Sequence, residues 1–276
     1  MRMLQLADSI RFKTMTTEAL RDTFLISDLF RPDELSFIYI DLDRTIVGSA
    51  VPTTAPIQLP TYDALKAKFF TERRELGILN IGGAGKVSVG AQEFALNRLD
   101  GLYVGRGNED VHFSSVDPNR PAEFYLLSYP AHAEYPTQLI RSAELERTKI
   151  GAAESANARE ITRLIHLDGA RSCQLVMGFT QLAPGSVWNT MPPHTHMRRS
   201  EVYLYFDLAD GERVFHLMGP AKETRQIIVA NKQVAVSPGW SIHAGVGTRN
   251  YAFCWGMGGE NQVYSDMDAL AVADLL

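Results

Sequence analysis

The stretch His194-Thr-His196-Met-Arg-Arg-Ser-Glu201-Val-Tyr-Leu-Tyr-Phe206 places two imidazoles and a carboxylate at the start of a run of strand-forming residues. In an extended strand, residues i and i+2 point to the same side, so His194 and His196 reach one point from a single strand. Glu201 opens the next strand, and a turn between the two strands brings its carboxylate to the same point. The stretch therefore predicts two strands that aim three polar side chains at a common focus.

A second segment, Ser237-Pro-Gly-Trp-Ser-Ile-His243, adds a fourth side chain after a Pro-Gly corner. Neutral imidazoles and a carboxylate are the usual ligands of divalent first-row metals. A lone histidine near a loop is more often an ordinary polar residue, but a His-x-His pair followed by a glutamate and a later histidine favours a metal site. We predict that His194, His196, Glu201 and His243 bind one metal ion.

The composition is that of a globular chain with 276 residues, of which 45% are hydrophobic and 21% charged, enough for one large domain or two ordinary ones. The net charge is −5 and no long basic run occurs, which argues against a nucleic-acid partner. Cys173 and Cys254 lie in apolar surroundings, which favours buried thiols over a disulfide. With no secretory signal at the N-terminus and no long apolar run, we expect a cytoplasmic protein that does not span a membrane.

Most of the chain alternates short runs of Val, Ile, Tyr and Phe with Gly, Pro and Asp, which predicts an all-β sandwich or barrel. Near the N-terminus, Thr16 or Thr17 is expected to cap a short helix. The two halves of the chain have similar length and rhythm, which indicates an internal duplication. We expect an N-terminal domain of residues 1–157 without metal ligands and a C-terminal metal-binding domain of residues 158–276.

Two motifs in the first half suggest other functions and are rejected. Asp41-Leu-Asp43-Arg-Thr45 matches the Asp-x-Asp-x-Thr of haloacid-dehalogenase-type phosphatases, but no helix pattern and no later acidic pair follow it. Gly82-Gly-Ala-Gly85-Lys86-Val has neither the first glycine nor the final Ser or Thr of a phosphate-binding loop. We expect both stretches to form turns between strands.

The His-x-His-x4-Glu set and the later histidine resemble the two metal-binding motifs of the cupin superfamily. This resemblance implies a tandem cupin, in which each half is a double-stranded β-helix or jelly roll with short helical segments.

At a finer level the chain resembles the 5-keto-4-deoxyuronate isomerase family. The resemblance is carried by long phrases of the second half and shorter ones of the first: Leu182-Ala-Pro-Gly-Ser-Val-Trp-Asn-Thr-Met-Pro-Pro-His-Thr-His196, Arg198-Arg-Ser-Glu-Val-Tyr-Leu-Tyr-Phe206, Ser237-Pro-Gly-Trp-Ser-Ile-His-Ala-Gly-Val-Gly-Thr248, Trp255-Gly-Met-Gly-Gly-Glu-Asn-Gln-Val263 and Asp100-Gly-Leu-Tyr-Val-Gly105. It implies one Zn²⁺ per subunit on His194, His196, Glu201 and His243, although this ligand set also suits iron or manganese.

The family resemblance further implies an aldose–ketose isomerase of pectin and polyuronate degradation. The reaction would convert 5-dehydro-4-deoxy-D-glucuronate to 3-deoxy-D-glycero-2,5-hexodiulosonate, and the partners would be this small keto-deoxyuronate and further copies of the chain in a homo-oligomer, a hexamer. Two alternatives stay open: a cupin metalloenzyme of another type, a dioxygenase or a lyase, and a sugar-binding cupin without catalysis.

Candidate substrate contacts follow from the same reaction. A carboxylate substrate calls for a fixed cation, for which Arg198, Arg199 and Arg225 are candidates, although each also suits a structural charge. Tyr203 and Tyr205 share the strand face of Glu201 and are either acids or core aromatics, and Trp188 either closes the pocket wall or simply packs. The sequence identifies no general base.

Overall fold

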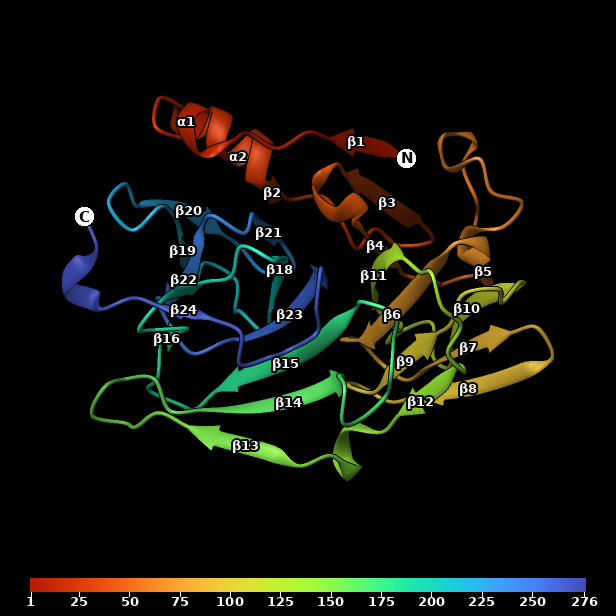
Figure 1. Cartoon of the computed structure of the whole chain (residues 1–276). Helices are drawn as coiled ribbons and strands as arrows, with labels where there is room; N and C mark the ends of the chain where they lie inside the picture. Colours follow the sequence, from red (N-terminus) through yellow and green to blue (C-terminus); the bar gives the residue numbers. More distant parts are fainter. The chain divides into compact units, whose positions relative to one another are not determined.

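The computed structural model describes residues 1–276 and consists almost entirely of β-strands, which confirms the predicted all-β class (Figure 1). The chain divides into two compact units, the first formed by Met1–Leu4, Asp28–Leu145 and Leu164–Val176, the second by Gln5–Ser27, Glu146–Arg163 and Met177–Leu276. Each unit contains one seven-stranded and one four-stranded sheet. No helix of the chain has the length and apolarity needed to cross a membrane.

The first unit packs its two sheets face to face. The larger sheet has the order β1 (Arg2–Leu4), β3 (Leu35–Ile40), β4 (Ile46–Ala50), β11 (Phe124–Pro130), β6 (Arg74–Asn80), β9 (Gly101–Val104) and β12 (Gln138–Ile140). The smaller sheet has the order β5 (Ile57–Gln58), β10 (Val111–Ser115), β7 (Gly85–Val89) and β8 (Gln92–Leu96). Ile78 and Leu126 of the larger sheet share one buried core with Val87 and Phe113 of the smaller sheet. This arrangement is that of a jelly roll, in which inward-facing residues of both sheets form the core.

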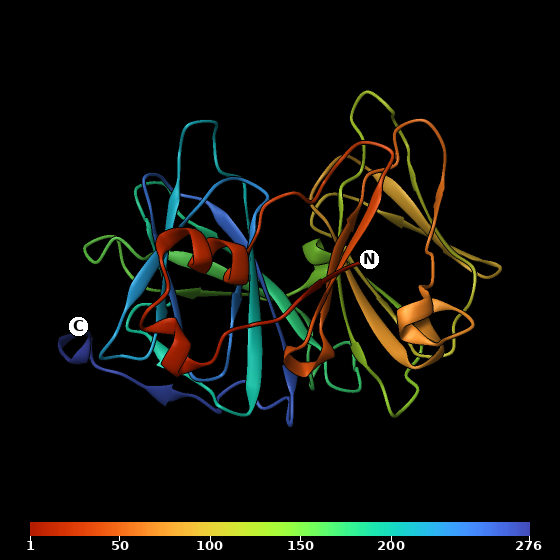
Figure 2. The same ribbon diagram turned by 90° about the horizontal axis from the view of Figure 1, so that it is seen from above.

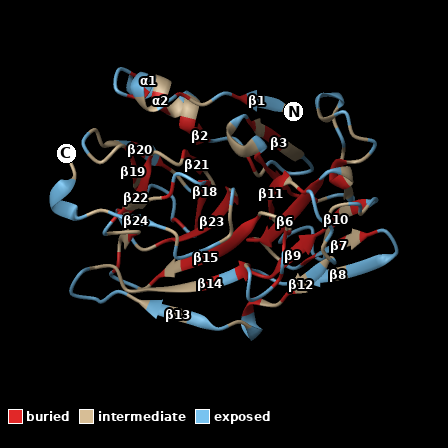
Figure 3. Cartoon of the chain, viewed as in Figure 1, coloured by how far each residue is buried: buried red, intermediate tan, exposed pale blue.

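The second unit repeats this architecture. Its larger sheet has the order β13 (Arg147–Ile150), β14 (Arg159–Ile165), β15 (Val176–Leu182), β23 (Ala252–Gly259), β18 (Arg199–Phe206), β21 (Val234–Ser237) and β2 (Leu25–Ile26). The smaller sheet has the order β16 (Trp188–Asn189), β22 (Ile242–Gly247), β19 (Val214–Gly219) and β20 (Arg225–Val229), and a separate ribbon pairs β17 (His194–Thr195) with β24 (Asp268–Ala269). β18 is buried along its whole length between β23 and β21, whereas the edge strand β13 is largely exposed (Figure 3).

The N-terminal helices belong to the second unit, which they cover on one face (Figure 2). α1 (Ser9–Phe12) is capped by Asp8, and α2 (Thr17–Phe24) is capped by the hydroxyl of Thr16, which accepts a hydrogen bond from the amide of Ala19 at 3.2 Å. The helix predicted at Thr16 is thus confirmed. The rings of Phe12 and Phe24 contact Trp240 at 5.4 and 6.3 Å, and β2 then pairs with β21 as an edge strand.

The division of the chain differs from a simple border after residue 157 in two stretches. Residues 5–27 join the second unit because their helices and β2 pack against it. Residues 164–176 join the first unit, where the buried carboxylate of Glu75 accepts the backbone amides of Cys173, Gln174 and Leu175 at 2.6 to 2.8 Å. Both cysteines are free thiols.

Both rejected motifs connect consecutive strands, the first within one sheet and the second from one sheet to the other. Asp41–Thr45 closes the β3–β4 hairpin through the short 3-10 helix η1 (Leu42–Arg44), and Gly82–Ala84 links β6 to β7. The remaining 3-10 helices are η2 (Asp63–Leu65), η3 (Phe70–Glu72), η4 (Ser142–Glu144) and η5 (Val272–Asp274).

Candidate metal centre

The second unit brings His194, His196, Glu201 and His243 together, with one possible ligand atom of each residue within 4.8 Å of the others. His194 lies on β17 and His196 directly follows it, while Glu201 lies on the central strand β18 and His243 on β22 of the smaller sheet. The two sheets of the unit therefore contribute to one focus. These four residues can hold a metal ion.

The local sequence explains this convergence. β18 keeps Glu201 in register with Met257 of β23 and Ser237 of β21, so its backbone cannot shift without breaking both pairings. The residues Pro238 and Gly239 end β21 and turn the chain toward β22, where His243 lies opposite Met218. Because side chains alternate along a strand, the inward position of Glu201 also points Tyr203 and Tyr205 inward.

The hydrogen bonds of the cluster define which ring nitrogens face the centre. His196 Nδ1 lies 2.9 Å from the carbonyl oxygen of Arg199, which can only accept, so Nδ1 carries the proton. In a neutral ring, Nε2 then presents a lone pair to Glu201 Oε2, 2.9 Å away. His243 Nε2 lies 2.9 Å from the same carboxylate oxygen and 3.0 Å from His194 Nε2. Ring nitrogens of three imidazoles and one carboxylate oxygen thus meet at one point, where a single cation can bind all of them.

The electrostatics favour the protonation states of metal ligands at His194 and Glu201, whereas at His196 burial is outweighed by the hydrogen bond to Glu201 together with its charge, which raise the pKa. Burial lowers the pKa of His194 to about 3, helped by the neighbouring His243, so its imidazole is neutral at ordinary pH. Burial alone would raise the pKa of the Glu201 carboxyl, but His243 and His196 outweigh it and lower that pKa. Neutral imidazole and carboxylate together are the donor set of a divalent first-row cation.

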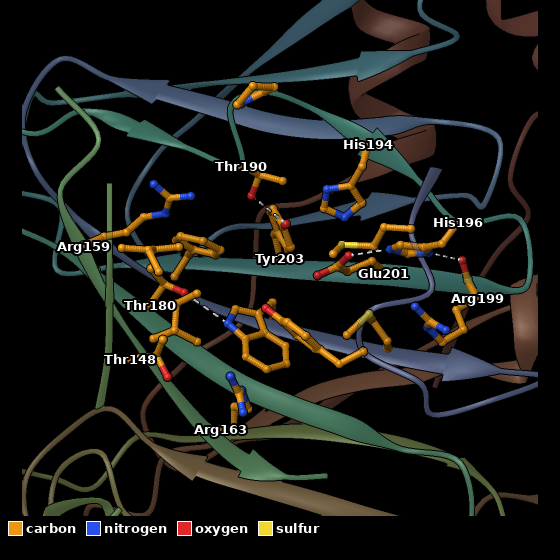
Figure 4. Close-up of a pocket in the computed structure, with 18 residues that line it drawn as sticks. Thr148, Arg159, Arg163, Thr180, Thr190, His194, His196, Arg199, Glu201 and Tyr203 are labelled. Carbon is orange, nitrogen blue, oxygen red and sulfur yellow. Dashed lines mark hydrogen bonds and ion pairs between the residues drawn. The ribbon is translucent and has the colours of Figure 1, made fainter. Parts of the chain in front are cut away.

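A cavity of about 320 Å³ opens beside the cluster and has His194, His196 and Glu201 in its wall (Figure 4). One side is apolar and consists of Phe253, Trp255 and Met257 of β23 together with Ile161 of β14. The cavity has the size and mixed lining of a site for a small polar molecule.

Two arginines in the cavity wall were not predicted from the sequence. Arg159 and Arg163 lie on β14 with Ile161 between them, and all three side chains face the cavity. In the sequence, Arg-Glu-Ile-Thr-Arg reads like any half-exposed strand. The alternation of side chains along a strand places both arginines on one face of β14. It does not predict which face of β14 meets β18, the strand of Glu201.

Among the candidate substrate contacts, Arg199 and Tyr203 line the cavity and Trp188 does not. Arg199 is almost fully buried and donates to Asn261 Oδ1 and to the backbone carbonyl of Asp266, so its guanidinium already has protein partners. The hydroxyls of Tyr203 and Thr190 lie 3.1 Å apart. Trp188 is excluded because the next residue of β16, Asn189, faces inward, and alternation turns Trp188 to the other side.

The other candidates lie outside the cavity. Arg198 forms an ion pair with Asp266, and Arg225 donates to the backbone carbonyls of Lys13 and Met15. Tyr205 lies deeper in the barrel, where its hydroxyl is 2.7 Å from His216 Nδ1. These groups are structural charges and a buried hydrogen-bonding tyrosine.

The C-terminal segment supplies a further wall that the sequence did not indicate. Tyr264 and Met267 line the cavity, and the Tyr264 ring lies 5.5 Å from that of Trp255. Asp266, between them, bonds to both Arg198 and Arg199, and β24 then pairs with β17, with Ala269 opposite His194. We call residues 260–270 the C-terminal strap.

Comparison of the chain with known proteins identifies a family and several similar sequences. Residues 29–273 match the KduI/IolB family. A protein of Shouchella clausii is 51% identical over 264 residues, 96% of each chain, and one of Escherichia coli O127:H6 is 47% identical over 269 residues, 97% of each chain. Both carry the name 4-deoxy-L-threo-5-hexosulose-uronate ketol-isomerase.

Solved structures share the fold at much lower identity. An IolB-like protein from Salmonella typhimurium LT2 superposes with a TM-score of 0.69 at 14% identity, covering 90% of this chain and 96% of the other. The oxalate decarboxylase of Lactobacillus farciminis, in its formate complex, gives 0.60 at 12% identity, covering 90% and 88%. At these identities the likeness is one of fold, and it agrees with the predicted tandem cupin.

Proposed function

This chain belongs to the KduI/IolB family, and from that membership we propose that it is a metal-dependent ketol-isomerase of 4-deoxy-L-threo-5-hexosulose-uronate. The product is 3-deoxy-D-glycero-2,5-hexodiulosonate, in the breakdown of pectin-type polyuronates. The observation that carries the proposal is the cluster of three imidazoles and one carboxylate in the wall of a cavity that accommodates a six-carbon acid.

We further propose one Zn²⁺ per subunit on His194, His196, Glu201 and His243. The fit rests on the donor set, in which three imidazole nitrogens and one carboxylate oxygen lie within 4.8 Å of one another inside the protein. Iron and manganese suit the same ligands. A divalent cation here would supply Lewis-acid stabilisation of the negative charge that develops on the substrate's C1 and C2 oxygens.

The chain's own residues bind the substrate, exclude water and move the proton. The apolar wall of Phe253, Trp255 and Met257 keeps water away from the reacting carbons. Burial raises the pKa of the Tyr203 hydroxyl well above its ordinary value, helped by the nearby charge of Glu201, so this hydroxyl stays protonated and can donate a hydrogen bond to a substrate oxygen. Glu201 is the only carboxylate that lines the cavity, and it can move the proton between C2 and C1 only when its bond to the proposed metal loosens.

The decisive experiment combines metal analysis of the purified protein with NMR of the reaction product. We expect stoichiometric metal and conversion of the aldehyde substrate to the 2-ketone, and we expect the His243→Ala variant to lose both together. His132→Ala, which changes an exposed histidine of the first unit, serves as the matched control. Full turnover by a metal-free His243→Ala protein, or oxygen consumption without isomerisation, would overturn the proposal.

The remaining features of the proposal concern the whole protein. We propose that the first unit binds no metal and that the protein assembles as a cytoplasmic homo-oligomer, a hexamer. Apolar side chains exposed on the C-terminal region support assembly: Val263, Tyr264, Met267, Val272 and Leu276. Light scattering of the purified protein measures the assembly directly, and a monomeric mass would contradict it.

A further inference from the structure

We infer that Arg159 and Arg163 bind the carboxylate of the substrate and so make the cavity specific for uronates. This inference rests on the proposed isomerase function and adds to it the residues that select an acidic substrate.

The first step is the placement of the two arginines. Both come from β14, separated by Ile161, and line the cavity: Arg159 lies at the left of the view and Arg163 at the bottom, whereas His196 and Arg199 lie at the right (Figure 4). The cavity thus has a metal-binding end and a cationic end.

The second step is that neither guanidinium has an acidic partner in the protein. Arg159 is partly buried, which lowers its pKa, yet its guanidinium donates only to the backbone carbonyl of Asn157, at 2.7 Å. Arg163 lies over the ring of Tyr264, 5.4 Å from its centroid, and forms no ion pair. Arg199, the third arginine of the wall, is already bonded to the C-terminal strap. Arg163 is exposed, so the cost of an unpaired charge falls on the partly buried Arg159, and an anionic ligand would offset that cost.

The third step is the charge balance of the wall. Its only acidic side chain, Glu201, is engaged by His196 and His243 at 2.9 Å. Two positive charges therefore remain uncompensated at the cationic end. Arginine presents paired N–H donors that match the two oxygens of a carboxylate.

The fourth step is the shape of the substrate. Its name specifies an aldehyde at C1, a ketone at C5 and a carboxylate at C6. Isomerisation involves C1 and C2, so these carbons must lie at the metal-binding end. In the extended chain C6 lies about 6 Å from C1 by ordinary bond lengths, so the carboxylate meets a part of the cavity wall away from the metal-binding residues.

The test compares two substrates on matched variants. The first substrate is the uronate, and the second is the analogue with a primary alcohol at C6. For Arg159→Gln and for Arg163→Gln, we expect kcat/KM on the uronate to fall about 10- to 100-fold, mainly through KM, while kcat/KM on the alcohol stays unchanged. Arg159→Lys should recover part of the loss, and Arg249→Gln, which changes an exposed arginine outside the cavity, should behave as wild type.

A binding measurement separates this inference from the proposed function. The probe is the analogue with an alcohol at C1, which keeps the carboxylate and cannot isomerise. Calorimetry should show weaker binding to both Gln variants by a similar factor, with unchanged melting temperatures. If wild-type protein does not turn over the uronate, the proposed function fails, and the calorimetry still decides the role of the arginines. Unchanged binding of this probe, or equal losses on both substrates, would overturn the inference.

Discussion

Tyr203 and Tyr205 offer a matched pair of buried hydroxyls on the same face of β18. The Tyr203 hydroxyl faces the cavity beside Thr190, whereas that of Tyr205 lies one layer deeper against His216. We predict that Tyr203→Phe lowers kcat about 100-fold, the size of effect of a lost proton donor, while the metal content stays unchanged. Tyr205→Phe should leave kcat within a few-fold of wild type. Steady-state kinetics with metal analysis checks both, and equal losses would assign Tyr203 a structural role.

The carboxylate of Asp33 makes the stability of the first unit depend on pH. Its carboxylate accepts the hydroxyl and amide of Thr53 and the amide of Thr54 at 2.6 to 2.8 Å, and the Thr53 hydroxyl is the main reason that its pKa falls from 3.8 to about 2. A folded-state pKa below the unfolded value stabilises the fold above the unfolded pKa, and this stabilisation is lost as the pH falls toward 2.

We therefore predict that Asp33→Asn flattens the loss of melting temperature between about pH 4 and pH 2. Asparagine keeps the left-handed backbone at this position, where φ is 56°. Asp22→Asn, which changes an exposed aspartate, is the control. Parallel melting curves of the Asp33 variant and wild type across this range would contradict the prediction.

At the scale of elements, the carboxylate of Asp266 is one of the attachments between the C-terminal strap and the segment that carries the proposed metal ligands. Asp266 bonds to Arg198, Arg199 and Asn261, and hydrogen bonding by Arg198 is the main reason that its pKa is lowered. The strap carries Tyr264 and Met267 of the cavity wall and pairs through β24 with the strand of His194.

We predict that Asp266→Ala raises KM about 10-fold and speeds amide exchange in residues 260–270, because the strap loses its attachment while the metal ligands remain. Asp274→Ala, in the exposed tail that follows, should change neither quantity. Hydrogen exchange followed by mass spectrometry, together with steady-state kinetics, checks this. Unchanged exchange in the Asp266 variant would show that β24 pairing alone holds the strap.

The elements also show which features the sequence makes predictable. His194 on β17 and His196 just after it point to the same focus by local periodicity, and Thr16 caps its helix through a bond three residues away, so short-range rules suffice. The role of Arg159 and Arg163 depends on which face of β14 meets β18 and β23, which is a long-range choice. The same holds for Asp266, whose two arginine partners precede it by more than sixty residues. Local patterns predict the fold class and the ligand set, and tertiary register decides the rest of the cavity.

At the scale of the molecule, we expect metal binding and folding of the second unit to be linked. The four proposed ligands come from three segments of that unit, β17 with the residue after it, β18 and β22, so the unfolded chain does not present them together. A cation bound only by the folded state at 1,000 times its Kd adds about 4 kcal/mol of stability. We predict that a chelator lowers the melting temperature of wild type by several degrees and abolishes turnover, and that zinc restores both. His243→Ala should melt at the same temperature with and without chelator, and a chelator effect on that variant would point to a different site.

The placement of residues 5–27 has a consequence for how the protein is made. During translation these residues leave the ribosome first, yet the strand that receives β2 and the tryptophan that meets Phe12 and Phe24 are synthesised more than two hundred residues later. Phe12 and Phe24 therefore have no packing partner in Trp240 until the intervening chain has been made. Conversely, a fragment that starts at residue 146 leaves β21 with a bare edge and Trp240 uncovered, which invites pairing between neighbouring chains. Attaching residues 5–27 after the C-terminus of such a fragment should again pair β2 with β21 and cover Trp240.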